Sequence, residues 1–483
     1  MSYPMFKTFR EFCNEYEMPL ARALFHISNR GLLVDDNRLG KFKKYVQGEI
    51  DNCLDKASTA ASRKVVGVGY KGKDEVLKIA SPKAVADQIK KLGIHIPKSK
   101  TAKGWVEDAT KGATLQRIFS KTGNEFVWQV IRFREMQRMM SYANITLLDN
   151  ILYSTYKATG TVGGRRSSSE NFLGLGTNGQ NLPKHSKVGM LYRSCIVARP
   201  GKIFIWGDQK SAEDWIVHGI IADVTEGRIT TGIDQLLAGI NRHRKLASKL
   251  FGKPEEQIDK AGIEYFLGKK TRHAGHYGMR GQRYSDSLAE KGIHLTADVC
   301  DHFLKIFHQE EPQIEKVFQK YVETELTNHR SLTTPIGRGR DFFALRNFSD
   351  NSSVFRDAYS YIPQSTVGDN TGLSILWMET NHPGWTVADH HDALGEEVDD
   401  SIDSVVRTID AMQQSMKREI EFPKGFKLTI PSEFEIGYDL GSMVSCDDLS
   451  RTGLTAIYNS LDRSQRVPFD TTFGVPQPSL QQA

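Results

Sequence analysis

The sequence has few cysteines and lacks any long hydrophobic run. Its five cysteines stand singly along 483 residues and show no spacing typical of a metal site, so we expect reduced thiols, as in a cytosolic protein. No apolar stretch approaches the roughly 20 residues that a membrane-spanning helix needs. No signal peptide is recognisable in the first residues. The composition therefore predicts a soluble globular protein in the cytoplasm, without a membrane partner.

Positive charge is concentrated in the first third of the chain. Residues 1–150 carry 26 lysine and arginine side chains against 16 aspartate and glutamate side chains, whereas the other residues carry 38 against 42. Such a distribution suits a phosphate-binding part joined to a carboxylate-bearing part. A lysine-rich, solvated surface explains it equally well. At this length we expect two or three subdomains.

Hydrophobic periodicity predicts a largely helical chain with short strands between the helices. One helix is expected to begin near Pro19 and another directly after Ser81, a suitable N-cap residue. Four expectations concern later segments: a continuous helix over 296–328, a helix that is reached through residues 356–369 and ends at Trp377, an acidic helix start over 396–403, and a loosely held tail over 450–483.

Two short extended segments each lead to an aspartate. The apolar run at 202–206 precedes Asp208, and the run that begins at Trp385 precedes Asp392. Carboxylate oxygens are the ligands that Mg²⁺ prefers, and two metal ions about 4 Å apart, held by shared carboxylates, catalyse nucleotidyl transfer. Each aspartate alone has an ordinary explanation, a helix N-cap for Asp208 and a hairpin turn for Asp392. Their joint pattern favours a pair of metal ligands.

A third segment combines a cation and an aromatic residue on one helical face. If residues 268–280 are helical, Lys269, His273 and Tyr277 follow one another at intervals of four residues. This face carries almost no aliphatic side chain, so packing against a core explains it poorly. A ligand with a polyphosphate at one end and a base at the other explains it better.

The order of these and other segments resembles a known family. The chain is similar, from about Tyr16 to Met443, to the polymerase region of A-family (DNA polymerase I-like) DNA polymerases. The matching segments, in chain order, are 16–20 with 31–35, 164–169 with 180–183, 208–213, His243 with 250–252, 269–278, 337–340, and Arg356, Gln364, Asp369, His391 and Asp392. One such motif would be weak, whereas this many in sequence is a specific signal.

The resemblance implies an α+β right-hand polymerase fold. Its parts are a basic, helical thumb at 1–150 whose first residues can pack on the palm, an antiparallel-sheet palm at 151–215 and 347–450, helical fingers at 216–346, and a C-terminal tail at 451–483. It also implies template-directed addition of deoxynucleotides to a primer 3′-OH by a two-metal mechanism. The expected partners are primer–template DNA and deoxynucleoside triphosphates, and we expect a monomer.

The resemblance also implies residue roles. Metal ligands would be Asp208, Asp392 and the backbone carbonyl of Gln209, holding two Mg²⁺ ions for which Mn²⁺ can substitute. The nucleotide side would comprise Lys269, His243, Tyr277, His273, Gln209 and Glu213, the last as the steric gate against a ribose 2′-OH. The DNA side would comprise Arg165, Gln364, Arg356, His391, Gln180 and Asn181.

The sequence also departs from the family pattern. Tyr265 replaces an arginine, His273 replaces an aromatic residue other than histidine, and Ala393 replaces the acidic residue after the motif C aspartate. These changes motivate an alternative, a catalytically silent primer–template-binding protein with the same fold. A related RNA polymerase is disfavoured by Glu213. The resemblance begins at the thumb, so we expect no exonuclease activity in this polypeptide, proofreading by a separate exonuclease or other replisome protein, and a bacteriophage or viral type acting in the host cytoplasm.

Overall fold

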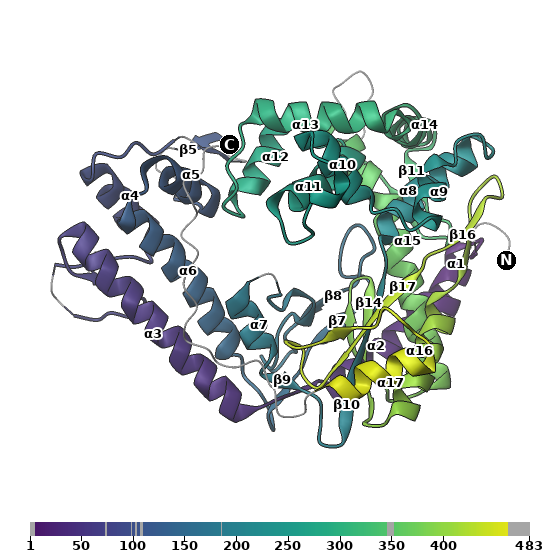
Figure 1. The fold of residues 1–483 in the computed structure, drawn as a ribbon, viewed down its shortest axis with the longest axis horizontal. Coiled ribbons are helices and arrows are strands. Elements are labelled where there is room, and N and C mark those ends of the chain that lie inside the picture. The colour runs from purple at the N-terminus through teal and green to yellow at the C-terminus, as the bar shows by residue number, and fades with distance from the viewer. Residues whose placement is uncertain are drawn as a thin grey trace. The chain divides into compact units, whose positions relative to one another are not determined.

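The computed structural model describes residues 5–72, 75–97, 99–101, 104–106, 110–184, 186–344 and 352–461 (Figure 1). These residues form two compact units. Unit 1 comprises residues 5–35, 145–279 and 302–461, and unit 2 comprises residues 36–144 and 280–301. Among the described residues, no helix is both long enough and apolar enough to cross a membrane.

The helices and strands are short and numerous. Helices of unit 1 are α1 (Phe9–Phe12), α2 (Met18–Arg30), α7 (Lys187–Arg193), α8 (Ala212–Val224), α9 (Thr231–Leu237), α10 (Arg242–Phe251), α11 (Ile263–His276), α14 (Lys320–His329), α15 (Ser352–Asn381), α16 (Ile402–Met416) and α17 (Arg451–Ser460), with π-helical turns at Cys13–Glu17 and Ile314–Gln319. Its strands are β1 (Leu32–Val34), β6 (Ile151–Leu152), β7 (Thr155–Lys157), β8 (Ser167–Ser169), β9 (Ile196–Val197), β10 (Lys202–Gln209), β11 (Ser331–Thr333), β12 (Gly339–Asp341), β13 (Thr386–His390), β14 (Ala393–Asp399), β15 (Glu419–Glu421), β16 (Lys427–Thr429), β17 (Ser432–Gly437) and β18 (Val444–Ser445). Unit 2 holds α3 (Asp36–Ala61), α4 (Pro82–Lys91), α5 (Gly112–Thr122), α6 (Glu125–Ala143), α12 (Gly281–Ala289), β2 (Val65–Val66), β3 (Leu77–Lys78), β4 (Ser99–Thr101) and β5 (Gly104–Val106), and α13 (Ala297–Glu310) crosses the boundary between the units.

The largest sheet of unit 1 has the strand order β13-β14-β10-β17-β18, with antiparallel pairing throughout. Side chains alternate between the faces of a strand, so Ile203, Ile205 and Gly207 share the face that α16 covers, where Met412 lies against Gly207. Asp208 therefore projects from the opposite face. The mixture of helices with an antiparallel sheet confirms the predicted α+β class.

Helix α15 is longer than expected. It is one 30-residue helix, Ser352–Asn381, with Pro363 in its interior, whereas we expected the helix to be reached only after Asp369 and to end at Trp377. Proline removes one backbone donor and disfavours the helical conformation of the preceding residue. Packing against α2, α8 and α16 outweighs that local cost, and most side chains from Ala358 to Met378 are buried.

Two further expectations are corrected. The helix expected over 296–328 is interrupted at Glu311, directly before Pro312, between α13 and a π-helical turn that leads into α14. The acidic segment at 396–399 belongs to strand β14 rather than to a helix start, because it pairs with β10 along its length and Glu396 is fully buried there.

The C-terminal segment expected to be a loose tail, residues 450–483, starts with an ordered helix. Helix α17 starts at the N-cap Ser450 and buries Leu454 against the core that α16 shares with the sheet. Residues 450–460 are therefore not a loosely held tail. The remainder of that expectation, from residue 462 onward, lies outside the described residues.

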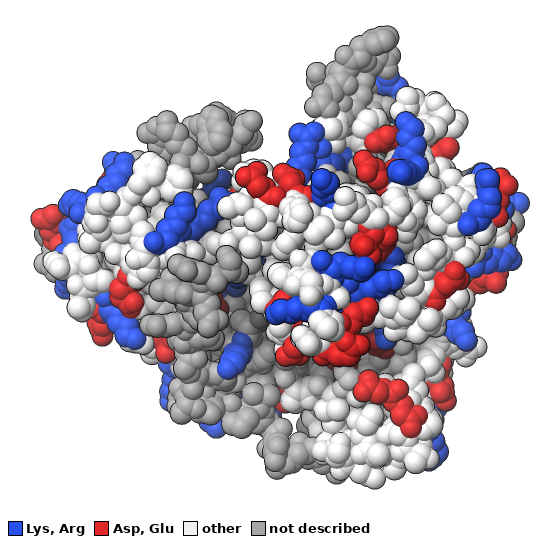
Figure 2. All heavy atoms as spheres, turned by 45° about the horizontal axis from the view of Figure 1, so that its top comes forward, with Lys and Arg blue, Asp and Glu red and all other residues white. Residues whose placement is uncertain are grey.

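Unit 2 is built on the packing of α3 against α6. Part of its positive charge is neutralised internally, because Arg132 on α6 forms ion pairs with Glu49 and Glu135 at 3.1 and 2.8 Å. On the face drawn in Figure 2, lysine and arginine side chains lie among aspartate and glutamate side chains. The compact units differ from the expected boundaries, since residues 5–35 belong to unit 1 and residues 280–301 belong to unit 2.

Candidate functional site

The sheet brings Asp208 and Asp392 together. Asp208 lies near the end of β10, and Asp392 lies in the two-residue turn of the β13–β14 hairpin. The register pairs Asp208 with Ala393, and the Gln209 amide donates to the Asp392 carbonyl at 3.2 Å. Two residues that are far apart in the sequence thus occupy adjacent strand ends, as expected.

Among the described residues, no guanidinium group is hydrogen-bonded to either of the two carboxyl groups. Asp208 is exposed at the strand end, but surrounding protein atoms displace part of its hydration. This partial loss of hydration and the neighbouring Asp392 carboxylate raise the pKa of Asp208 to about 7, while Lys184 opposes that shift. Loss of hydration also raises the pKa of Asp392, with Glu213 contributing, whereas a backbone hydrogen bond, Arg165 and Lys184 oppose that shift. The two carboxyl groups come from neighbouring strands and together carry excess negative charge. Their oxygen atoms are ligands that fit hard divalent cations.

A buried ion pair between Arg166 and Asp389 stabilises the β13–β14 hairpin. Arg166, 4% exposed, donates through Nε and Nη2 to Asp389 at 2.8 and 2.7 Å and through Nη2 to the His391 carbonyl at 2.9 Å. The Gln180 side chain is buried and donates to Asp389 at 3.2 Å. His391 has a φ of 64°, a left-handed conformation that is uncommon for residues other than glycine. Sequence reasoning missed Arg166 and Asp389, because nothing separates them from their charged neighbours before the fold is known.

Segments that carry the family resemblance also meet away from the carboxylates. Arg338 donates through Nε and Nη2 to Asp369 and through Nη2 to Glu17 at 2.5 Å. The Tyr16 hydroxyl donates to the same Asp369 at 3.0 Å. These four buried or nearly buried side chains join the first helices of unit 1, the β11–β12 turn and α15, and thereby fix α15 behind the site.

Glu213 is the centre of a second cluster, at the start of α8. It accepts hydrogen bonds from the Tyr277 hydroxyl and from Arg165, and its Oε2 lies 3.8 Å from Nδ1 of His273. The rings of His273 and Tyr277 meet edge to face with centroids 5.1 Å apart. Burial and the Glu213 carboxylate raise the pKa of Tyr277 well above its usual value, so the phenol remains a donor.

Helix α11 presents the expected row of side chains. Lys269 and His273 are exposed on it, and Tyr277 follows directly after its last residue. Gly268 allows α10 to approach closely, since a Cβ atom there would lie 2.5 Å from the His243 carbonyl oxygen. Burial and the nearby Arg272 lower the pKa of His243 to about 4, so its imidazole is neutral at physiological pH.

The other candidate residues take several positions around these clusters. The Gln209 side chain is buried and bonded to Thr371 at 2.6 Å and Asn370 at 2.8 Å, both on α15, so only its backbone is available to the site. Gln364 and Arg356 are half-buried on α15. Asn181 is exposed. The hydroxyl of Ser365 bonds to the Gly163 carbonyl, which brings the Gln364 region of α15 next to the segment that carries Arg165.

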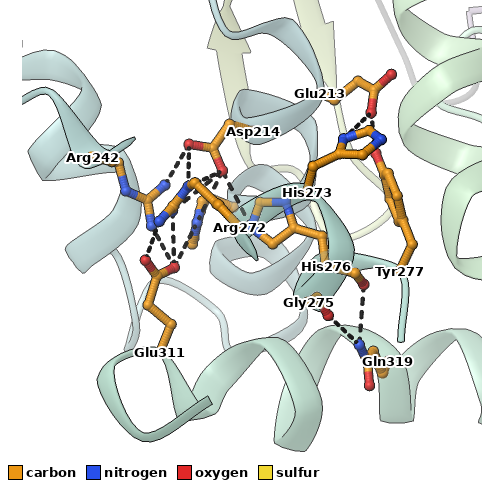
Figure 3. Close-up of polar contacts among 11 residues, drawn as sticks. Glu213, Asp214, Arg242, Arg272, His273, Gly275, His276, Tyr277, Glu311 and Gln319 are labelled. Carbon is orange, nitrogen blue, oxygen red and sulfur yellow. Dashed lines mark hydrogen bonds and ion pairs between the residues drawn. The ribbon is translucent and has the colours of Figure 1, made fainter. Parts of the chain in front are cut away.

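A buried charged cluster, which the sequence did not reveal, lies on the opposite side of α11 from His273 and Tyr277 (Figure 3). Arg242 and Arg272 both donate to Asp214 and to Glu311. Burial alone would raise the pKa values of the two carboxyl groups, but the guanidinium groups, Arg272 foremost, lower both well below their usual range. The cluster is therefore internally compensated.

Two histidines complete this cluster. His218 and His276 are buried, with their Nε2 atoms 3.7 and 3.4 Å from Oδ1 of Asp214. Burial lowers the pKa of both, so they are neutral at physiological pH. Asp214, His218 and His276 are metal-ligand types at suitable separation, but a divalent cation there would face two buried guanidinium groups bound to the same carboxylates. The residues fit an ion-pair cluster better than a metal site.

Comparison with known proteins agrees with the motif order. Residues 50–441 match the family model described as DNA polymerase family A. Among curated relatives, the DNA polymerase of Bacillus phage SP01 is 23% identical over 362 residues, covering 70% of this chain and 37% of that protein. DNA polymerase I of Mycobacterium tuberculosis strain H37Rv is 27% identical over 251 residues, covering 50% of this chain and 25% of that protein. The chain thus spans well under half the length of these relatives.

One solved structure covers most of the chain. It is described as the POL domain of Pol1 from M. smegmatis in complex with DNA primer-template and dNTP. Its TM-score is 0.72 at 18% sequence identity, covering 89% of this chain and 71% of that one. At this identity, the likeness establishes a shared fold.

Proposed function

The chain belongs to DNA polymerase family A, and from that premise we propose that it is a template-directed DNA polymerase that adds deoxynucleotides to a primer 3′-OH. The single observation that carries the proposal is the pairing of Asp208 with the residue after Asp392, which sets two uncompensated carboxylates side by side at the end of the sheet. Family membership alone would also fit a protein that had lost its chemistry. The carboxylate pair is what argues against that loss.

Asp208 and Asp392, with the backbone carbonyl of Gln209, would hold two Mg²⁺ ions, and Mn²⁺ could replace them. When bound, such ions activate the attacking hydroxyl and stabilise the charge on the leaving pyrophosphate. Asp208 and Asp392 suit divalent cations because their ionised carboxylates repel one another, and a bound cation would relieve that repulsion. Arg166 and Asp389 contribute by holding the turn that presents Asp392.

The nucleotide would lie along α11. Lys269, exposed at one end of the row, would contact the triphosphate together with the neutral imidazole of His243. Tyr277, at the other end, would pack at the nascent base pair. Its hydroxyl holds Glu213 in place, so Glu213 would exclude a ribose 2′-OH at a fixed position beside His273.

The primer terminus would lie beside Arg165. Arg165, Gln364 and Arg356 would contact the minor groove and backbone near the primer end, where hydrogen-bonding information is largely degenerate. Asn181 and His391 would contribute from the neighbouring loop and hairpin turn. Gln180 would act indirectly, through Asp389, because its side chain is buried.

Primer extension by the purified chain, with Mg²⁺ and either deoxy- or ribonucleotides, tests the proposal. Template-directed deoxynucleotide addition that Asp392→Ala abolishes is the expected result. Tight primer–template binding without extension by the wild-type chain would instead support the silent binder suggested by Tyr265, His273 and Ala393.

The remaining parts of the proposal concern the setting of the enzyme. We propose the thumb, palm and fingers at the boundaries given above, a C-terminal segment at 451–483 that begins with the packed helix α17, a monomeric state, and action in the cytoplasm, with the host cytoplasm as the place for a viral protein. Proofreading would come from a separate exonuclease or other replisome protein. Assay of the purified chain on a labelled, mismatched primer tests the last point, and release of 3′ nucleotides would contradict it.

A further inference from the structure

Three helices of unit 1 share one arrangement around the candidate nucleotide face. Each places one residue in the buried charged cluster, and the next or preceding residue is one of the candidate nucleotide-binding residues. The pairs are Asp214 and Glu213 at the start of α8, Arg242 and His243 at the start of α10, and Arg272 and His273 on α11. Figure 3 shows the two groups on either side of α11, with Glu213 near His273 and Tyr277, and Asp214 near the arginines.

The buried group of each pair is held by several charged contacts. Arg242 donates to Asp214 at 2.9 Å and to Glu311 at 2.6 Å. Arg272, whose side chain is 2% exposed, reaches Asp214 at 3.2 Å through Nε and Glu311 at 3.0 Å through Nη2. Charge-assisted, multiply bonded guanidinium groups are the most orientation-specific contacts that side chains make. The cluster therefore fixes the relative positions of the three helices.

Glu311 is the member of the buried cluster that lies on none of the three helices α8, α10 and α11. It lies between α13 and the π-helical turn at Ile314–Gln319, next to Pro312. The same turn anchors the end of α11, because Gln319 donates to the carbonyls of Gly275 and His276 at 3.0 Å each. Glu311 thus ties the cluster to the segment that also holds the backbone directly before Tyr277.

We propose that Asp214, Arg242, Arg272 and Glu311 are positioning residues that set the geometry of the nucleotide face and, with it, selectivity for the deoxyribose sugar. The inference rests on the proposed function, because it takes Glu213, His243 and His273 as nucleotide-facing groups. Consecutive residues share a peptide plane, so a shift of a cluster residue moves its neighbour at the face. Displacements of about 1 Å at positions remote from the reacting atoms can cost roughly a hundredfold in rate.

Glu311→Gln is the sharpest test variant, since it keeps the shape of the side chain and one acceptor oxygen, while it removes the charge and replaces the second acceptor with a donating amide nitrogen. Glu379→Gln is the matched control. Glu379 also forms a bidentate ion pair with an arginine, Arg30, and its side chain is 10% exposed against 14% for Glu311, but it lies on α15 away from α8, α10 and α11. Thermal unfolding of both variants measures the general cost of losing such a pair.

The readout is the affinity of the ternary complex for the matched deoxy- and ribonucleoside triphosphates, measured on a primer–template with a dideoxy-terminated primer. This measurement needs no turnover. Failure of the wild-type chain to extend a normal primer would therefore refute the proposed function, while the affinities would still test the positioning role. Affinity for the primer–template itself serves as the internal reference.

In Glu311→Gln, we expect deoxynucleotide affinity to fall about tenfold or more and the deoxy-to-ribo ratio to fall with it, at unchanged primer–template affinity. In Glu379→Gln, we expect a comparable loss of thermal stability and no change in either nucleotide value. If Glu311→Gln does not fold, Arg242→Lys, which keeps the charge and loses the fork of donors, is expected to shift the same ratio. The proposal is overturned if the folded cluster variant keeps wild-type affinity and ratio, or if the control shifts them equally.

Discussion

Asp208 and Asp214 are six residues apart in the sequence, but each belongs to a different pair of carboxyl groups, and the two pairs have opposite electrostatic surroundings. Within the part of the chain that the structure describes, no guanidinium group is hydrogen-bonded to Asp208 or Asp392 at the strand end, and the pKa of Asp208 rises to about 7. Asp214 and Glu311 are each bound by two arginines, and their pKa values fall well below the usual range. Charge left uncompensated is available to a cation, whereas charge compensated within the protein fixes helices. The first pair therefore suits the proposed catalytic metal site, and the second pair suits a structural role.

Asp392→Asn should produce the largest change in activity and no loss of stability. Removal of one of the two carboxylate ligands of the metal ions should slow nucleotide addition by about a thousandfold or more, because metal ions contribute several kcal/mol to such transition states. A raised pKa in the fold means that stability declines as pH rises above the unfolded value of about 4. At pH 8, the variant should therefore melt at the same or a higher temperature than the wild type. A lower melting temperature would show that the pair is compensated after all.

Asp214→Asn should have the opposite effect on stability. It leaves Arg242 and Arg272 buried with one carboxylate instead of two, and loss of one partner from a buried ion pair costs about 3–5 kcal/mol. Urea unfolding at pH 7 measures the loss. A change below about 1 kcal/mol would mean that the cluster is hydrated or rearranges freely, and the contrast between the two pairs would fail.

Lys269→Ala tests whether the exposed face of α11 binds nucleotide. The lysine is exposed, so stability should change little. The KM for the deoxynucleotide should rise about tenfold, as expected for one phosphate contact, with unchanged primer–template affinity. Steady-state kinetics at saturating primer–template give the comparison, and an unchanged KM would contradict the placement of the nucleotide.

Glu396 is a third kind of carboxyl group: it is buried, and no guanidinium group among the described residues is hydrogen-bonded to it. Burial raises its pKa to about 8, opposed by the Thr386 hydroxyl at 3.0 Å. The folded state then binds a proton that the unfolded state releases above about pH 4.5, so stability falls with rising pH up to about 8. The free energy of unfolding should drop by roughly 1.4 kcal/mol between pH 6 and pH 7 from this group. In Glu396→Gln that slope should be smaller by this amount, and an identical slope would exclude Glu396 as its source.

The sequence predicts this site only in part, for physical reasons. Asp208 and Asp392 could be placed together because each follows an extended apolar segment, and strand ends in one sheet lie side by side. Lys269, His273 and Tyr277 could be aligned because helical spacing is local. Arg242 and Glu311, by contrast, meet only through the tertiary fold, and each resembles an ordinary surface charge in the sequence.

The errors in secondary structure have the same origin. The sequence pattern indicates a helix only after Asp369, but packing against α2, α8 and α16 stabilises α15 from Ser352 onward, through Pro363. Residues 396–399 were taken for a helix start because they are acidic, although β10 provides their hydrogen-bond partners. Pro312 is a recognisable signal for the break after α13. The helical periodicity on both sides of it nevertheless favours one continuous helix.

Primer extension by the wild-type chain and Asp392→Asn, side by side with Mg²⁺ and at saturating primer–template, tests the central claim most directly. The account predicts template-directed deoxynucleotide addition by the wild type and a loss of about a thousandfold in the variant, with both chains folded and both binding primer–template. Extension by the variant at the wild-type rate, or binding without extension by the wild type, would contradict it.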